Sequence, residues 1–133
     1  MDSKTLNAFL NPEEKPNLRF VLSDRFKDEN GKPIEWELRP ISLTESLEIS
    51  KKYAHSDAGE IIAATIAQAL VIPDLRDKAL LDGLSKREGR SILDPLTALK
   101  VMLTDSEYGR LSSKYFKYNE FKGFDASIEA AKN

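Results

Sequence analysis

Residues 97–111 read TALKVMLTDSEYGRL and join two amphipathic segments with almost nothing between them. Thr104 and Glu107 have the Thr-x-x-Glu spacing of a capping box, in which each side chain bonds the backbone N–H of the other residue. A helix therefore begins directly after Thr104, where the preceding apolar stripe has just ended. The stretch predicts two helices joined by a very short corner.

The helix before this corner has its own start signal. Asp94 followed by Pro95 supplies an N-cap and a proline at the first helical position. Leu96, Leu99 and Leu103 then fall on one face, which we expect to pack on a core.

The helix after the corner carries aromatic side chains at helical spacing. The stripe consists of Tyr108, Leu111, Tyr115 and Tyr118, with Phe116, Phe121 and Phe124 just beyond it. Such a stripe is typical of a helix that packs on a core. Tyrosine is also favoured at interfaces, because it offers a large contact area and a hydroxyl that tolerates water. The sequence is compatible with both roles, packing on the core and binding a partner. The candidate partner-binding residues are Tyr108, Leu111, Tyr115, Tyr118, Phe121 and Phe124.

Two further helices are expected upstream. Ser42 and Glu45 form another capping box, so a helix should run from there to about Tyr53. The apolar run 58–72 contains several alanines and few polar side chains, which predicts a helix that is buried on most sides and ends at Pro73.

A short helix is expected at residues 77–84, where Leu80, Leu81 and Leu84 are the apolar positions. The polar stretch SKREGRS at 85–91 is interpreted as an exposed loop.

Two segments near the start have the alternating pattern of half-buried strands. The apolar positions are Leu18, Phe20 and Leu22 in the first segment and Ile34, Trp36 and Leu38 in the second. A three-residue loop at 29–31, with Gly31 in the left-handed conformation, brings the two apolar faces together. This hairpin would pair Asp28 with Lys32, Phe26 with Ile34, and Leu22 with Leu38.

The expected fold class is α+β and mostly α, with an N-terminal β-hairpin followed by a compact bundle of about five helices. All 133 residues are expected to form a single domain. Its parts would be an arm at 1–17 with one helical turn, the hairpin at 18–40, a helical part at 42–124 and a flexible tail at 125–133. The apolar residues of the arm could seal the core or reach a neighbouring subunit.

Composition excludes several classes of function. The 20 basic and 22 acidic side chains nearly cancel, and neither sign forms a long block, which argues against a nucleic-acid partner. The longest apolar run has a dozen residues, whereas a membrane span needs roughly 20, so no membrane partner is expected. The chain start lacks the pattern of a secretory signal.

The sequence offers no arrangement for catalysis. His55 is the single histidine and there is no cysteine, which excludes a thiolate zinc site and a site with several histidines in one chain. Neither glycine-rich phosphate-binding motif is present. We therefore expect a protein that is not an enzyme and has no cofactor or metal.

Five motifs in order resemble one family. They are LNAFLNP near the start, VLSDRFKDENGKPIEWELRPI in the hairpin, VIPDLRDKALLDGL, ALKVMLTDSEYGRL, and NEFKGFD near the end. Together they resemble the XkdN-like phage tail assembly chaperones, most specifically over residues 70–125.

The resemblance implies a protein of the bacterial host's cytoplasm that binds the tape measure protein, keeps it soluble and helps to recruit tail tube subunits, and that is absent from the mature virion. The tube protein would be reached through a frameshift-extended form, because Ala131-Lys132-Asn133 could be encoded by a slippery run of A nucleotides. The sequence is compatible with both a monomer and a homo-oligomer. The alternative function is a structural tail component, such as a tube or connector subunit, which would show much more strand.

Overall fold

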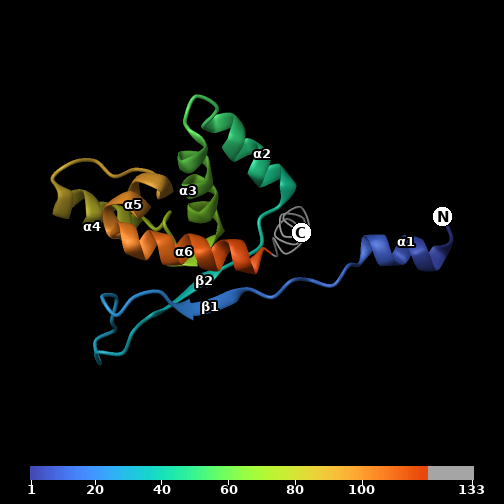
Figure 1. The fold of residues 1–133 in the computed structure, drawn as a ribbon, viewed down its shortest axis with the longest axis horizontal. Helices are drawn as coiled ribbons and strands as arrows, with labels where there is room; N and C mark the ends of the chain where they lie inside the picture. Colours follow the sequence, from blue (N-terminus) through green and yellow to red (C-terminus); the bar gives the residue numbers. More distant parts are fainter. Residues whose placement is uncertain (120–133) are drawn as a thin grey trace, which may run out of the picture.

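The computed structural model describes residues 1–119, and Figure 1 shows their arrangement. The elements are α1 (Ser3–Leu10), β1 (Leu18–Val21), β2 (Glu35–Leu38), α2 (Leu43–Lys52), α3 (Ala58–Ala69), β3 (Leu70–Ile72), α4 (Lys78–Glu88), α5 (Pro95–Met102) and α6 (Asp105–Tyr118). The fold is mostly helical with a small sheet, as predicted. Within these residues it has six helices, not about five, and a third strand joins the hairpin.

The three strands form an antiparallel sheet in the order β1-β2-β3. Helices α2 to α6 lie on one side of the β1–β2 ribbon in Figure 1. The register of β1 and β2 pairs Leu18 with Leu38 and Phe20 with Trp36. The prediction that Leu22 pairs with Leu38 was therefore wrong, although the apolar faces still match because the shift is an even number of residues.

The cause of the shift is a turn at residues 24–25, which the alternating sequence pattern did not predict. Near the loop the predicted pairing holds: the Asp28 N–H donates to the Lys32 carbonyl at 2.8 Å, and Gly31 has a φ of 78°. Between this end and β1 the first segment leaves the ladder, where the Arg25 N–H bonds the Ser23 hydroxyl at 3.1 Å. The Arg25 side chain then reaches α6, so long-range contacts replace strand pairing here.

The apolar run 58–72 is not one helix. Helix α3 ends at Ala69, and the last three residues form β3, in which Leu70 pairs with Leu38 and Ile72 with Glu37. The residue before Pro73 is biased away from helical backbone, and the free edge of β2 offers hydrogen bonds to an extended segment. Burial on most sides was expected, and it is found only in the second half of α3, where Ala64, Ile66, Ala67 and Ala69 are buried, whereas Ala58, Gly59 and Ile62 are exposed.

Helices α2, α5 and α6 begin at the residues where the capping signals in the sequence predicted them to begin. Ser42 with Glu45 and Thr104 with Glu107 form complete capping boxes, and Asp94 caps α5. Helix α4 differs, because it continues to Glu88 through most of the stretch that was predicted to be a loop. It ends only at Gly89, whose φ of 69° gives the left-handed C-terminal turn.

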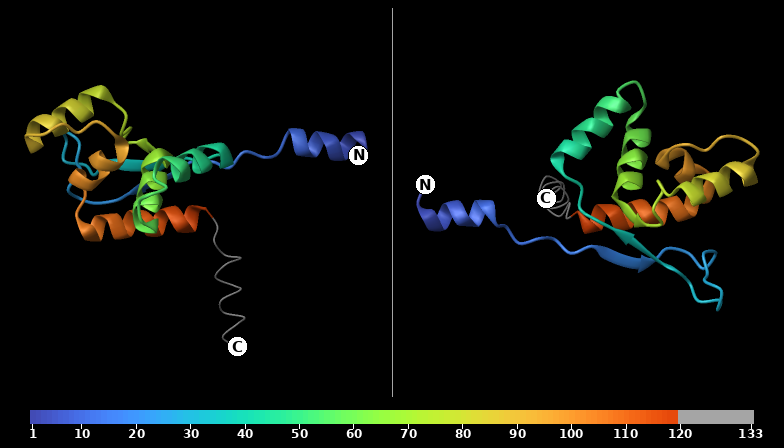
Figure 2. Two further views of the ribbon diagram at one scale, coloured as in Figure 1. Left: turned by 90° about the horizontal axis from the view of Figure 1, so that it is seen from above. Right: turned by 180° about the vertical axis from the view of Figure 1, so that it is seen from behind.

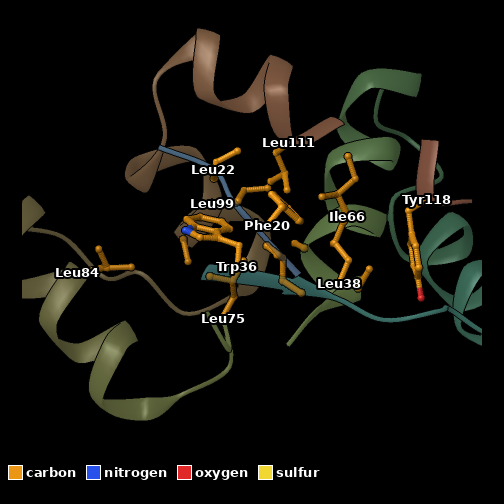
Figure 3. Close-up of a cluster of buried hydrophobic side chains, with 14 of the residues drawn as sticks. Phe20, Leu22, Trp36, Leu38, Ile66, Leu75, Leu84, Leu99, Leu111 and Tyr118 are labelled. Atoms are coloured by element: carbon orange, nitrogen blue, oxygen red, sulfur yellow. The ribbon is translucent and has the colours of Figure 1, made fainter. Parts of the chain in front are cut away.

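One apolar core joins the sheet to the helices. Figure 3 shows side chains from β1, β2, α3, α5 and α6 pointing toward one another, with Leu84 and Tyr118 at two ends of the cluster. Trp36 is 1% exposed, and the Phe26 ring meets it edge-on at 5.3 Å between centroids. The core therefore depends on residues far apart in the chain.

Helix α1 stands apart from this core. It spans eight residues, where one turn was expected, and none of them is buried. Figures 1 and 2 show it at the end of an extended linker, away from the other helices. The arm does not seal the core.

Candidate partner-binding surfaces

The predicted aromatic stripe of α6 faces inward. Leu111 is fully buried and Tyr118 is 9% exposed, whereas Tyr108 and Tyr115 are half-buried against the core. Burial raises the pKa of all three phenols. The predicted residues Phe121 and Phe124, like the predicted tail at 125–133, lie outside the described residues. The structure thus brings four of the six candidates together on one face that the chain itself largely covers.

Tyr118 also ties the arm linker to the end of α6. Its hydroxyl donates to the Pro16 carbonyl at 2.9 Å. The Lys15 ammonium donates to the Tyr118 carbonyl and lies 4.5 Å from the centre of the tyrosine ring. The Tyr118 side chain therefore makes its contacts within the chain. These contacts hold the linker that follows α1 against the end of α6.

An ion pair between the half-exposed Arg25 and the buried Glu107 joins the hairpin to the corner between α5 and α6. The Arg25 guanidinium donates to both carboxylate oxygens of Glu107, at 2.9 and 2.7 Å, and to the Met102 carbonyl at 2.9 Å. The bonds from Arg25 hold the pKa of the 2%-exposed Glu107 well below its usual range. Arg25 could not be predicted as a partner of Glu107, because nothing local in the sequence marks an arginine whose partner lies 82 residues away.

A second arginine–glutamate pair lies at the start of α2. Arg39 donates to the two carboxylate oxygens of Glu45 at 3.0 and 2.7 Å, and the Gln68 amide donates to the same carboxylate at 2.8 Å. The hydrogen bond from Arg39 has the largest effect and the bond from Gln68 the next largest, and both lower the pKa of the Glu45 carboxyl. The network joins the residue that follows β2 to α2 and α3.

A hollow of about 380 Å³ opens between α3, α5 and α6. Its apolar lining comes from Ala63, Leu96, Leu99, Leu103 and Tyr108, and its charged residues are Asp57, Glu60, Lys100 and Asp105. Among the predicted partner-binding residues within 1–119, Tyr108 alone lines this hollow. The sequence predicted one wall of the hollow, because Leu96, Leu99 and Leu103 were expected on one face of a helix. It did not predict that a small residue of α3 would lie opposite this face and leave room beside it.

Several apolar side chains are exposed elsewhere. Leu6, Phe9 and Leu10 on α1 are 45%, 74% and 68% exposed, and Leu43 and Leu47 on α2 are 74% and 60% exposed. The pair on α2 is one helical turn apart and therefore lies on one face. These residues are contact surface that a partner could cover.

Residues 1–119 contain no group of three or more acidic, histidine or cysteine side chains placed to hold a metal ion. None of the helices described there has the length and apolar character that crossing a bilayer requires. His55 lies exposed in the turn between α2 and α3.

Comparison with solved structures finds a similar fold. The crystal structure of the protein YqbN matches with a TM-score of 0.66 and 22% sequence identity, covering 86% of this chain and 95% of that one. At this identity the likeness concerns the fold alone. No curated protein matches the chain.

Comparison with protein families is more specific. The model of the phage XkdN-like tail assembly chaperone proteins matches residues 6–132, which is nearly the whole chain. The resemblance found in the sequence motifs is thereby confirmed, and the chain belongs to the XkdN-like phage tail assembly chaperone family.

Proposed function

We propose that this chaperone binds the tape measure protein, keeps it soluble and helps to recruit tail tube subunits during tail morphogenesis. It acts in the cytoplasm of the bacterial host and is not part of the mature virion. The observation that carries the proposal is the family match over residues 6–132. The family is one of assembly chaperones, and nothing in the proposed role requires catalysis.

Exposed apolar side chains support this role. A protein that keeps another chain's apolar helices in solution must offer apolar surface of its own, in the mode where a helix lies in a groove. Here that surface is formed by the exposed side chains of α1 and α2 and by the hollow between α3, α5 and α6. The helix-rich fold gives no support to a tube or connector subunit.

Co-expression with the tape measure protein of the same phage tests the proposal. We expect an affinity pulldown to recover a soluble complex with several copies of this chain per tape measure protein, as measured by light scattering. The tape measure protein expressed alone should aggregate. A well-folded chaperone that stays separate from an equally soluble tape measure protein would contradict the proposal.

For the tube protein we propose contact through a frameshift-extended form of the chain. Sequencing the last codons of the gene tests this, and the absence of any slippery site would end the idea. A pulldown with the extended form and with the 133-residue form, using the tube protein as bait, then separates the two. Only the extended form should be captured.

A further inference from the structure

The hollow between α3, α5 and α6 combines an apolar floor with an acidic rim. We propose that it holds a bulky apolar side chain of a partner helix that carries a lysine or arginine beside this anchor. The inference rests on the proposed function, because the partner helix is taken to belong to the tape measure protein.

The floor is suited to an apolar anchor. Leu96 and Leu99 form its buried part, while Leu103 and Tyr108 are half-buried at its sides. Ala63 of α3 has only a methyl group, and the room beside it remains open instead of being filled by the chain. A bulky side chain inserted here would remove apolar surface from water on both partners, which is the main source of affinity in such contacts.

The rim gives the expected partner its charge. Three acidic residues, Asp57, Glu60 and Asp105, surround the hollow together with Lys100. The Lys100 ammonium is paired with Glu60 at 2.6 Å, and this bond raises the pKa of Lys100. Three negative charges and one positive charge leave a net charge of −2, carried by Asp57 and Asp105, so a basic residue next to the anchor is favoured.

Two features limit the strength of this attraction. Asp57 is the N-cap of α3, where it accepts the Glu60 N–H at 2.8 Å, and Asp105 lies in the first turn of α6. The positive ends of both helix dipoles offset part of the acidic charge. The rim is therefore expected to contribute selectivity and a few-fold in affinity, with the apolar floor contributing more.

The concave shape distinguishes this hollow from the other exposed apolar residues. Leu6, Phe9 and Leu10 are exposed on α1, which stands apart from the other helices, and Leu43 and Leu47 are exposed on α2. Side chains of that kind need a groove on the partner, whereas the hollow can itself receive a side chain.

The variant Ala63→Arg tests the floor, because its long side chain would occupy the hollow. Ala79→Arg is the matched control, since Ala79 is an exposed position of α4 outside this hollow. Wild type and one variant are co-expressed in equal amounts with tagged tape measure protein, and intact-mass spectrometry gives the ratio captured. We expect Ala63→Arg to be depleted about tenfold and Ala79→Arg to remain near parity. Circular dichroism checks that both variants fold.

The double variant Asp57→Asn/Asp105→Asn tests the rim without removing the cap, because asparagine is as good an N-cap as aspartate. We expect about threefold depletion at low salt, and a return toward parity at high salt because screening weakens such attraction. This variant decides the question if Ala63→Arg fails to fold.

The outcomes separate the inference from the proposed function. Capture of folded Ala63→Arg at parity, or of the Asn double variant at parity in low salt, would overturn the inference and leave the chaperone role intact. Failure to capture wild type would overturn both. If Ala63→Arg abolishes self-association of this chain but not capture, the hollow holds a second copy, and the partner-helix inference is wrong.

Discussion

Helices α2 and α6 begin in the same way and end up in opposite environments. Each starts with a capping box whose glutamate is also bonded by an arginine, Arg39 to Glu45 in α2 and Arg25 to Glu107 in α6. Yet the Glu107 side chain is 3% exposed and the Glu45 side chain 26%.

The faces of the two helices differ even more. Helix α6 buries Leu111 and Tyr118 in the core, whereas α2 has no buried residue and exposes Leu43 and Leu47. Capping signals therefore set where a helix begins, but contacts from distant segments decide which of its apolar side chains are covered. Helix α2 therefore presents apolar side chains that another protein could cover.

The largest expected effect is in α6. Leu111→Ala should lower the free energy of unfolding by about 3 kcal/mol, because it leaves a cavity in a fully buried site. Leu47→Ala in α2 is the matched control and should change it by less than about 0.5 kcal/mol. Urea unfolding of both variants gives the two values. Equal losses would mean that α2 is covered in solution.

Removing the charge of the capping glutamate should also lower the free energy of unfolding more in α6 than in α2. Glu107→Gln should cost about 2 kcal/mol and Glu45→Gln about 1 kcal/mol, because the Glu107 carboxylate is the more deeply buried of the two, although Arg25 itself is half exposed. Glutamine still suits the capping box, so each change mainly removes the charge opposite the arginine. Urea unfolding at neutral pH measures both. A larger loss for Glu45→Gln would show that the Gln68 bond outweighs burial.

Acid should weaken both pairs. The folded-state pKa of Glu45 and of Glu107 lies below the ordinary value of 4.5, chiefly through the bonds from Arg39 and Arg25. Their stabilisation is therefore fully present above about pH 4.5 and is lost as the pH falls below it. The free energy of unfolding should drop more steeply below this pH in wild type than in the double variant Glu45→Gln/Glu107→Gln. Parallel pH profiles would contradict the assignment.

Local signals in the sequence predicted much of the fold. The Ser42, Asp94 and Thr104 caps and the left-handed Gly31 depend on neighbours within a few residues, and all four are found. Strand β3 could not be predicted from local signals. A run of three apolar residues is compatible with helix or strand, and it is the backbone hydrogen bonding to the distant β2 that makes this run a strand.

The candidate site shows the same limit. Helical spacing identified the stripe that contains Leu111 and Tyr118, but it could not show that the core covers these residues. The hollow lies between α3, α5 and α6, and the small residues Gly59 and Ala63 of α3 are part of its lining. Its position follows from packing between helices, which no single segment encodes.

The smallest expected effect gives the sharpest test of the comparison. The double variant Leu43→Ser/Leu47→Ser should leave the free energy of unfolding within about 0.5 kcal/mol of wild type, because both side chains are mostly in water. Urea unfolding at two protein concentrations measures it. A loss above about 1 kcal/mol that grows with protein concentration would mean that a second copy covers this face, since association stabilises only the folded state. Helix α2 would then be buried between subunits, as α6 is within one, and the two helices would differ only in which chain covers them.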